Sequence, residues 1–600
     1  MRILSSDLSK HIDQTVEVQG FLNNIRLLGK LNFLILRDRQ GFIQVVIQDK
    51  NEFKKLNDLQ IGSILKIKGK VVKSLQKDLG VEIIDPCIEV QVEVKDVSPI
   101  EYYKPEIPSD LEYILDHRPL ALRNRKIQAV FKIQAEIAYA YRNFMHDEVE
   151  AVEYFPPNMI GASSEGGSEF FNVDYFGHTA TLAQSSQLYK QIMVGVNERA
   201  FALVPFFRAE KSNTPRHLTE GKQMEFEMGF FDHWHEVLDV QESCVKYIIK
   251  YLNKACEKEI KILGDDIVKA PENVPFPRIP IKEAQEIYYQ RTGTDDRKES
   301  DLSPAAEKEL CKYVKEKYKT DFVFITDWAT SKRPFYSFVN EKDKEITNTF
   351  DLLCAGAEIT SGGQRRNTYE SMVEGIVAKD MDPKNFEDYL SVFKYGMPPH
   401  GGFGMGLERF TMTVLKLKNI REVSLFPSDP KRIAGNRIKA KMFFGGENIK
   451  NEIIRILKEN NIEFEHIKHE HTPTSQDSAR VRNTKLEEGV KSIILIGKSS
   501  KKNYHVNIPS NMKIDMKAIS SLVGEKCEFE KVEIIKERFG LEVGGVPPFG
   551  NLLNLDTFFD ERIPKEKRSA FNCGLTTESI VMNSKDLIDV INPKIGNFAK

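Results

Sequence analysis

The chain begins with short runs in which apolar residues occupy alternate positions. Runs of this kind cover residues 16–19, 32–37, 42–47, 64–72 and 81–84, with turn-forming residues between them. Alternation of this type is typical of strands that have one face in a core and one face in solvent. We therefore expect residues 1–100 to form a small β-barrel.

A different pattern follows a proline-interrupted segment at residues 102–119. In residues 124–145 apolar side chains recur every three or four positions, which predicts an amphipathic helix. We place a hinge at residues 101–125 and a second domain at residues 126–440.

Residues 208–227 contain two strand patterns separated by a polar turn. Arg208 and Glu210 share one face of the first strand, and Gln223, Glu225 and Glu227 share the polar face of the second, because alternate residues of a strand point the same way. This hairpin is therefore expected to carry reactive groups on one side and core on the other.

The turn of that hairpin is basic. Lys211, Arg216 and His217 flank the sequence Ser-Asn-Thr-Pro, where a polyphosphate or a nucleic-acid end can meet positive charge. Farther along, the run Gly401-Gly-Phe-Gly-Met-Gly406 leaves a strand nearly without side chains. A flat base can lie close to such a backbone.

Beyond Gly445-Gly446, helix and strand patterns alternate up to residue 600. They predict a third, α/β domain at residues 447–600. The chain as a whole is thus expected to be a multidomain α+β protein, which its 600 residues allow because about two to four domains fit this length.

Composition and charge exclude only a few classes of protein. The 86 basic and 88 acidic residues give a net charge of −2, so any nucleic-acid contact must come from local basic patches. The seven cysteines lack Cys-x-x-Cys spacing, which argues against structural zinc and a disulfide framework and favours a reducing cytoplasm. We expect no membrane segment, since no apolar run approaches the roughly 20 residues of a span.

The segments 208–227 and 401–409 resemble motifs 2 and 3 of the class II aminoacyl-tRNA synthetases. Residues 183–191, 395–404 and 421–427 resemble the archaeal-type aspartyl-tRNA synthetases of class IIb. This resemblance implies an oligonucleotide-binding (OB) barrel at the N-terminus and an antiparallel catalytic sheet with helices. It also implies ATP-dependent ligation of L-aspartate to tRNA(Asp) through an aspartyl-adenylate, and a homodimer in which Pro157 matches the motif 1 proline.

The resemblance assigns roles around ATP and Mg²⁺. Arg208 is expected to bridge the α-phosphate and the substrate carboxylate, and Arg409 to close the site; with Glu358 they form the catalytic set. Charge of this kind is needed because two anions must be brought together. The implied ATP ligands are Arg208, Glu210, Arg216, His217, Glu358, Gly406 and Arg409, and the implied magnesium ligands are Glu358 and Ser361.

For the amino acid, Lys190 and Arg365 match the two cations that hold the side-chain carboxylate in aspartyl enzymes. Two cations in a dehydrated pocket favour aspartate over its neutral amide. The full set implied for aspartate is Glu165, Gln187, Lys190, Arg208, Glu225, Ser361 and Arg365.

Some positions depart from the family pattern. Glu225 stands where aspartyl enzymes have aspartate and asparaginyl enzymes have glutamate, and Gly221 stands where an aromatic ring normally stacks on adenine. Gly221 removes that stacking surface unless Phe403 or Lys222 supplies a substitute. An asparaginyl-tRNA synthetase and a catalytically silent tRNA-binding paralogue therefore stay open as alternatives.

In the barrel, Asn23, Phe33, Gln44 and Glu82 match positions that bind the anticodon. An aromatic ring and an amide on neighbouring strands can stack on and read unpaired bases, although Phe33 is alternatively a plain core residue. Because Asn23 matches neither common choice of the family, charging of tRNA(Asn) as a second acceptor stays open.

The C-terminal segment resembles the YbaK and prolyl-tRNA synthetase insertion family, whose members deacylate wrongly charged tRNA. The resemblance rests on residues 471–476, 490–495, 544–550 and 571–574. It implies an editing pocket formed by Lys491, Gly544, Gly545 and Pro548. The competing interpretation is a surface lysine and an ordinary turn.

Overall fold

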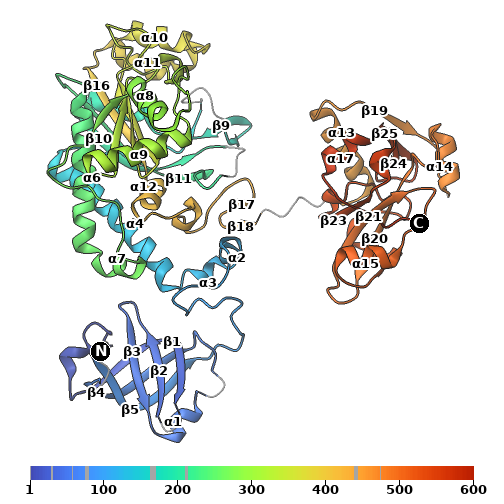
Figure 1. Cartoon of the computed structure of the whole chain (residues 1–600), viewed down its shortest axis with the longest axis horizontal. Helices are drawn as coiled ribbons and strands as arrows, with labels where there is room; N and C mark the ends of the chain where they lie inside the picture. Colours follow the sequence, from blue (N-terminus) through green and yellow to red (C-terminus); the bar gives the residue numbers. More distant parts are fainter. Residues whose placement is uncertain are drawn as a thin grey trace. The chain divides into compact units, whose positions relative to one another are not determined.

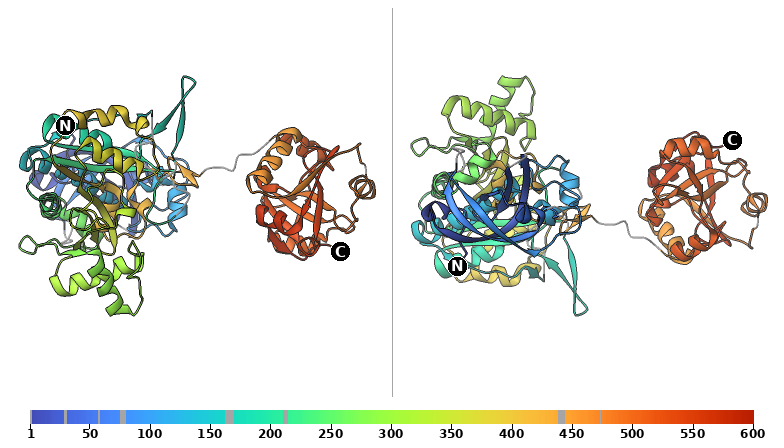
Figure 2. Two further views of the ribbon diagram at one scale, coloured as in Figure 1. Left: turned by 90° about the horizontal axis from the view of Figure 1, so that it is seen from above. Right: turned by 90° about the horizontal axis from the view of Figure 1, so that it is seen from below.

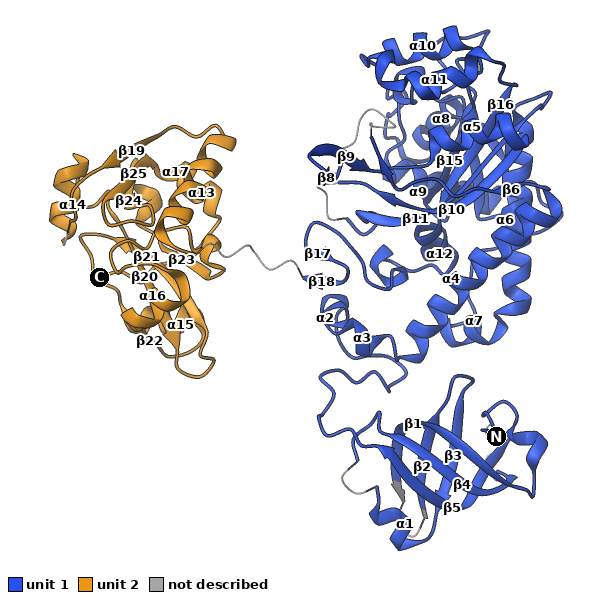
Figure 3. Ribbon diagram, turned by 180° about the vertical axis from the view of Figure 1, so that it is seen from behind, with its two compact units in different colours: residues 1–437 blue, residues 438–600 orange. Residues whose placement is uncertain are grey.

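The computed structural model describes residues 2–28, 31–56, 59–74, 80–161, 170–209, 214–437, 444–472 and 474–600. The chain forms two compact units, Met1–Arg437 and Ile438–Lys600, which Figure 3 shows in blue and orange. Among the described residues, no helix combines the length and apolar character needed to cross a membrane.

The N-terminal strands close into a barrel in the order β1-β2-β3-β5-β4, as expected. Leu34, Leu36 and Val45 point into its core. The first strand is much longer than its sequence pattern indicated, because it pairs with β4 along its first half and with β2 along its second. The strands are β1 (Thr15–Leu28), β2 (Leu31–Arg37), β3 (Phe42–Ile47), β4 (Ile64–Lys73) and β5 (Val81–Val92), with η1 (Leu8–His11) and α1 (Lys50–Lys54).

The hinge contains two short helices before the long helix predicted from its periodicity. Asn124 caps that helix, since its side chain accepts hydrogen bonds from the backbone amides of Lys126 and Ile127, and a cap of this kind stabilises a helix by about 1 kcal/mol. The helices are α2 (Leu111–Asp116), α3 (Arg118–Ala121) and α4 (Arg125–Asn143), followed by η2 (Phe144–Glu148).

The centre of unit 1 is an eight-stranded sheet in the order β12-β13-β14-β15-β16-β11-β10-β6. Its pairings are antiparallel except at the two edges, where β12 pairs with β13 and β6 with β10 in parallel. The strands are β6 (Val152–Glu153), β10 (Arg199–Phe207), β11 (Glu220–Gly229), β12 (Arg278–Pro280), β13 (Phe322–Thr326), β14 (Thr349–Cys354), β15 (Ala357–Gln364) and β16 (His400–Gly406).

The helices α4, α6 and α12 cover one face of this sheet (Figure 1), whereas α5 packs on β10, and α8 and α9 on β13, over parts of the other face. Phe226 and Phe403 on the covered face pack with residues of α4, α6 and α12 in one large core. The helices of the domain are α5 (Gln187–Asn197), α6 (His235–Ala255), α7 (Glu257–Leu263), α8 (Ile281–Thr292), α9 (Pro304–Tyr318), α10 (Tyr369–Val377), α11 (Glu387–Lys394) and α12 (Leu407–Val414), with η3 (Thr330–Lys332), η4 (Pro383–Phe386) and η5 (Ile420–Val423).

Two small sheets complete unit 1. One consists of β7 (Met159–Ile160), β8 (Asn172–Tyr175) and β9 (His178–Leu182), and the other of β17 (Arg432–Ile433) and β18 (Asn436–Arg437). Figure 2 shows the teal β8–β9 hairpin projecting from the body of the unit.

Unit 2 is an α/β domain, as its alternating patterns predicted. It contains a five-stranded sheet, β22-β20-β21-β23-β26, and a three-stranded sheet, β19-β25-β24. Its strands are β19 (Phe464–Lys468), β20 (Val490–Gly497), β21 (Asn503–Pro509), β22 (Cys527–Phe529), β23 (Asp556–Asp560), β24 (Arg568–Asn572), β25 (Glu578–Asn583) and β26 (Lys594–Gly596). Its helices are α13 (Gly446–Glu459), α14 (Ser475–Arg482), α15 (Met516–Val523), α16 (Val532–Phe539) and α17 (Ser584–Ile591), with η6 (Gly550–Leu553) and η7 (Ile563–Lys565).

Candidate active site

Two neighbouring cavities open on the polar face of the large sheet. One has a volume of about 180 Å³ and the other about 280 Å³. Both are lined by Arg208, Gln223, Ser361 and Gly404. Two ligands bound in them would therefore meet at Arg208, which follows directly after the end of β10.

The smaller cavity gathers the residues expected around ATP. It is lined by Arg208, Arg216, His217, Glu358, Gly406 and Arg409. Arg409 lies at its far wall, where Nη1 donates to the Glu358 carbonyl at 3.1 Å. Glu210 and Lys211 lie outside the described residues.

Arg216 is held by groups from distant parts of the chain. Its Nη1 lies 3.0 Å from Glu307 Oε2 on α9, and its Nη2 donates to the Gly356 carbonyl at 3.0 Å. Burial raises the pKa of Glu307 more than Arg216 lowers it. The guanidinium is thereby fixed at the cavity wall with donors still available for an anion.

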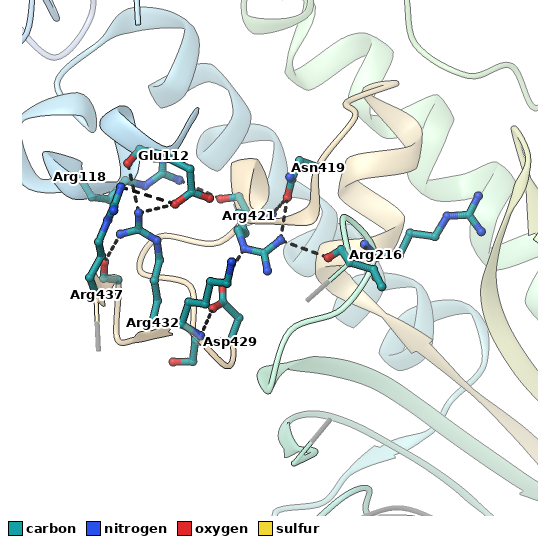
Figure 4. A network of polar contacts seen from close by, with 12 residues as sticks. Glu112, Arg118, Arg216, Asn419, Arg421, Asp429, Arg432 and Arg437 are labelled. Carbon is teal, nitrogen blue, oxygen red and sulfur yellow. Dashed lines mark hydrogen bonds and ion pairs between the residues drawn. The ribbon is translucent and has the colours of Figure 1, made fainter. Parts of the chain in front are cut away.

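The loop that carries Arg216 rests on the segment after α12. Arg421 contacts Asp429 through Nε at 2.6 Å and donates from Nη1 to the Thr214 carbonyl at 3.2 Å, and the Ile420 amide donates to the Pro215 carbonyl at 2.8 Å. Figure 4 shows Arg421 between Asn419, Asp429 and this loop. Sequence reasoning included Arg421 in a family-like segment but gave it no role, because the backbone carbonyls that it contacts leave no residue pattern.

The hinge is tied to the same segment. Arg118 of α3 is buried and donates to the carbonyls of Ser424 at 2.6 Å and Leu425 at 2.9 Å. Burial lowers the pKa of Arg118 to about 10. Arg432 lies 2.7 Å from carboxylate oxygens of both Glu112 and Asp116 on α2, so the hinge helices and the loop beneath the site form one polar network (Figure 4).

The larger cavity contains a buried quartet of charges. Lys190 Nζ lies 2.7 Å from Glu225 Oε2 and 3.4 Å from Glu227 Oε2. Arg365 Nε lies 2.8 Å from Glu227 Oε1. The two expected cations are thus together, and each already contacts a protein carboxylate.

Contacts within the quartet set the pKa values of Glu227 and Arg365. Burial by itself would raise the pKa of Glu227, yet Arg365 and Lys190 hold it below its ordinary value. Burial would lower the pKa of Arg365, but Glu227 raises it. Glu227 and Arg365 are therefore charged at neutral pH, and the contacts of Lys190 with Glu225 and Glu227 leave as many carboxylates as cations in the protein part of the pocket. Gln187 also lines this cavity, whereas Glu165 lies outside the described residues.

The glycines of β16 make room for these carboxylates. Gly402 pairs with Glu227 and Gly404 with Glu225. A methyl group at Gly402 would lie 2.3 Å from Glu227 Oε2, and one at Gly404 would lie 2.8 Å from Gln223 Nε2. The bare strand therefore accommodates the protein's own side chains at these two positions, while Gly406 borders the smaller cavity.

Phe403 does not supply the missing aromatic surface. Its ring is fully buried and packs on Phe226 at a centroid distance of 5.3 Å, within the core under the sheet. Lys222 is exposed and, through its backbone amide, donates to Glu408 Oε2 at 2.9 Å. The suggestion that Phe403 substitutes for an aromatic residue at position 221 was wrong, because alternate residues of β16 face opposite sides.

The expected magnesium ligands have an acidic neighbour that sequence reasoning missed. Asp351 on β14 pairs with Ser361 on β15. Burial first, and then the charge of Asp351, raise the pKa of Glu358 to about 7. Asp351 Oδ1 is buried without a hydrogen-bond partner in the described part of the chain.

These oxygens fit a hard divalent cation such as Mg²⁺. Arg333 also reaches them, with Nη1 donating to Ser361 Oγ at 3.0 Å and Nη2 2.8 Å from Asp351 Oδ2. The described residues contain no group of three or more His, Cys, Asp or Glu side chains able to hold a metal. A cation here would therefore share its ligands with substrate phosphates, as magnesium commonly does.

In the barrel, Phe33, Gln44 and Glu82 lie outside the apolar core, although Gln44 is itself buried. Gln44 Nε2 donates to Glu82 Oε2 at 2.8 Å. Phe33 is half-buried and lies outside the barrel core, which takes Leu34 instead, so the alternative of a plain core residue was wrong. Asn23 lies at a bulge of β1, where its register with β2 shifts.

In unit 2, the glycine loop is tied to β24. Asn572 Nδ2 donates to the Gly544 carbonyl at 2.6 Å, and Gly544 has a φ of +90° that favours glycine. Lys491 is exposed near the start of β20, two residues after Gly489, which bridges Ala570 of β24. Gly545 approaches the Gly574 carbonyl, and the Pro548 carbonyl accepts from the Gly550 amide at 3.1 Å.

Comparison with known families decides the class. The family described as tRNA synthetases class II (D, K and N) matches residues 110–430, more than half of the chain. The chain belongs to this family. The synthetase also matches the OB-fold nucleic acid binding domain at residues 16–100 and the aminoacyl-tRNA editing domain at residues 469–590.

Relatives cover the first two domains of the synthetase. An aspartate–tRNA(Asp/Asn) ligase of Thermus thermophilus is 39% identical over 72% of this chain and 100% of its own length. An aspartate–tRNA(Asp) ligase of Pyrococcus furiosus is 37% identical over 72% of this chain and 98% of its own. Among solved structures, asparaginyl-tRNA synthetase from Pyrococcus horikoshii complexed with asparaginyl-adenylate has a TM-score of 0.67 at 30% identity, covering 72% of this chain and 99% of that one.

Proposed function

We propose that the synthetase activates L-aspartate with ATP and transfers it to tRNA(Asp) through an aspartyl-adenylate. The observation that carries this proposal is the pair of adjoining cavities with Arg208 on their common wall. A carboxylate in the larger cavity and an α-phosphate in the smaller one would both contact this guanidinium. Positioning of two anions in this way removes much of the entropic barrier to their reaction.

The smaller cavity suits the triphosphate. Arg216, His217 and Arg409 bind and orient its oxygens, and Arg208 stabilises the charge that grows on the α-phosphate. Glu358 and Ser361, with Asp351 beside them, would hold Mg²⁺, which when bound supplies positive charge for the phosphates.

The larger cavity suits a small amino acid. Lys190 and Arg365 donate to its side-chain carboxylate, and Gln187 and Glu225 face its ammonium group. Because Glu225 already contacts Lys190 at 2.7 Å, aspartate must share this lysine with a protein carboxylate. The same contact favours a second candidate, asparaginyl-tRNA synthetase, because a neutral amide adds no charge to a balanced pocket.

The remaining parts fit tRNA. Phe33, Gln44 and Glu82 on the outer face of the barrel, with Asn23, would bind the anticodon, and tRNA(Asn) would be a second acceptor. Unit 2 would hydrolyse misacylated tRNA at Lys491 and the Gly544–Pro548 loop. We place the enzyme in the cytoplasm.

A homodimer is supported by exposed apolar side chains at the edge of the large sheet. Val152 on the edge strand β6 is 48% exposed, and Phe155 just after it is 84% exposed. Pro157, which matches the motif 1 proline, follows them in the sequence. Apolar surface of this kind at a sheet edge marks an interaction site.

Amino-acid-dependent exchange of pyrophosphate into ATP tests the ligase proposal. Exchange that depends on aspartate is expected, followed by aspartylation of tRNA(Asp). Exchange with asparagine alone would establish the second candidate. Binding of tRNA without formation of any adenylate would identify a silent paralogue and end the proposal.

The deacylase proposal has a separate test. A panel of mischarged tRNAs is incubated with the full chain, with Lys491→Ala and with Lys498→Ala, an exposed lysine just after the same strand. The Lys491 variant alone should lose hydrolysis. If the intact chain hydrolyses none of the panel faster than buffer, unit 2 is a tRNA-docking domain.

A further inference from the structure

An aromatic ring stands in the smaller cavity at a position that the sequence did not single out. Phe206, near the end of β10, pairs with Gly221 of β11. Since Ala202 of the same strand pairs with Glu225, alternation places Phe206 on the polar face of the sheet, with Glu225 and Gly221. Its side chain lines the smaller cavity together with Arg216 and Arg409.

The ring occupies the space that a side chain at position 221 would need. A methyl group on Gly221 would lie 2.7 Å from Phe206 Cε1 and 2.8 Å from Cζ. Any residue other than glycine would therefore push the ring away. The glycine at position 221 therefore leaves the space that the ring at position 206 fills.

The surroundings of the ring suit a nucleotide base. Phe206 is only partly buried, although apolar side chains of this size are usually buried when they serve only the core. The Arg208 guanidinium carbon lies 5.2 Å from its centroid. The ring thus stands beside the group that meets the α-phosphate, where the base of the same nucleotide must lie.

We propose that Phe206 is the stacking surface for the adenine of ATP, transferred from β11 to β10 and permitted by Gly221. This inference rests on the proposed ATP site. It names a binding residue on a different strand from the one at which the family resemblance placed the aromatic ring, and it makes Gly221 a requirement for that ring.

The first test is aspartate-dependent pyrophosphate exchange with Phe206→Leu, which keeps apolar volume but removes the aromatic face. Loss of stacking should raise KM for ATP by about 5- to 150-fold. KM for pyrophosphate, which has no base, and KM for aspartate should stay unchanged. Phe206→Tyr should behave like the wild type, and so should Phe207→Leu, a matched change on the opposite face of the strand.

A second test places the aromatic ring at position 221 of β11 instead of position 206 of β10. Phe206→Ala alone and Gly221→Ala alone should both raise KM for ATP, the latter by displacing the ring. The double variant F206A/G221F places a ring on β11 and should recover much of the ATP affinity that Phe206→Ala loses.

The outcomes separate stacking from general damage. An unchanged KM for ATP in Phe206→Leu, a parallel rise in KM for pyrophosphate, or a double variant no better than Phe206→Ala would overturn the inference. If the wild type catalyses no exchange with any amino acid, the proposed function fails. Calorimetric binding of ATP and of inorganic triphosphate to the same variants then decides the role of Phe206 by itself.

Discussion

The contact between Lys190 and Glu225 is the least expected pair in the amino-acid pocket. Both side chains are buried, and their charged atoms lie 2.7 Å apart. A buried ion pair is retained only when its geometry is good, because removal of both groups from water costs several kcal/mol. The lysine is therefore satisfied before any substrate arrives.

Shortening Glu225 should release this lysine. The carboxylate of Glu225→Asp would retreat by about 1.3–1.5 Å, so that Lys190 keeps its contacts with Glu227 and the Phe403 carbonyl and gains a donor for the substrate. We expect KM for aspartate to fall by about 3- to 10-fold and the preference for aspartate over asparagine to rise in pyrophosphate exchange. Glu220→Asp, at the exposed start of the same strand, is the control. A rise in KM for aspartate would show that the contact of Glu225 with the substrate ammonium outweighs its competition for Lys190.

The sequence predicted residues of the candidate site only where they belong to recognisable motifs. Arg208, Arg216, Glu358 and Arg409 do meet in one cavity. Asp351, in contrast, sits in an otherwise apolar strand, and meets Ser361 only through pairing of β14 with β15. Alternation from Arg208 places Phe206 on the same strand face, but its position opposite Gly221 depends on the register between β10 and β11, which local sequence does not encode.

Unit 2 has a buried histidine that makes its stability depend on pH. Burial lowers the pKa of His505 to about 3, from about 6.5 in an unfolded chain. Between these values the unfolded chain binds more protons, so stability falls as pH drops from about 6.5 towards about 3.

We expect unit 2 to lose roughly 2–3 kcal/mol of stability between about pH 6.5 and about pH 4.5. His505→Gln should flatten this dependence. Urea unfolding followed by both circular dichroism and tryptophan fluorescence measures this pH dependence. Both tryptophans, Trp234 and Trp328, lie in unit 1, so fluorescence reports the unfolding of unit 1. The part of the transition seen by circular dichroism but not by fluorescence then reports unit 2. Equal pH dependence in the variant and the wild type would assign the effect to other groups.

At the scale of elements, β16 shows how pairing decides the role of a glycine. Gly402 faces Glu227 and the Phe226 carbonyl, and a methyl group there would lie 2.0 Å from that carbonyl oxygen. The nearest atom to a methyl group at Gly406 is Arg409 Cβ at 3.5 Å. Glycine is thus required at different positions of one motif for different physical reasons.

Alanine substitution should separate these reasons. Gly402→Ala must displace backbone, and we expect it to cost about 3 kcal/mol or more of folding stability. Gly406→Ala should leave stability nearly unchanged. The thermal transition seen by tryptophan fluorescence reports both, and similar transitions in the two variants would contradict the steric account.

The sequence predicted the presence of helices and strands better than it predicted their lengths. Alternation identified the barrel strands and the hairpin, and three-to-four spacing identified α4. The pattern failed for β1, where a bulge after Leu22 interrupts strict alternation although pairing continues.

At the scale of the whole molecule, the two units have separate cores. Ile449, Phe549 and Phe571 belong to a cluster within unit 2, while Phe226 and Phe403 belong to one within unit 1. Both cavities are formed entirely by unit 1. Each unit therefore has what it needs to fold and act separately.

A chain ending at Arg437 should keep the exchange activity and the fluorescence-detected melting temperature of the full chain. It should lose deacylation, including hydrolysis of its own errors, because tethering supplies a high effective concentration of the editing unit. Adding unit 2 as a separate protein should restore this hydrolysis only at much higher concentration. An inactive or unfolded truncation would show that the units depend on each other.

The exclusion between Phe206 and any side chain at position 221 also has an evolutionary consequence. A lineage cannot acquire the second ring before it loses the first, so the exchange must pass through an intermediate that binds nucleotide weakly or in another pose. Substitutions at these two positions are thus epistatic, and their order in descent is constrained by the space between two paired strands.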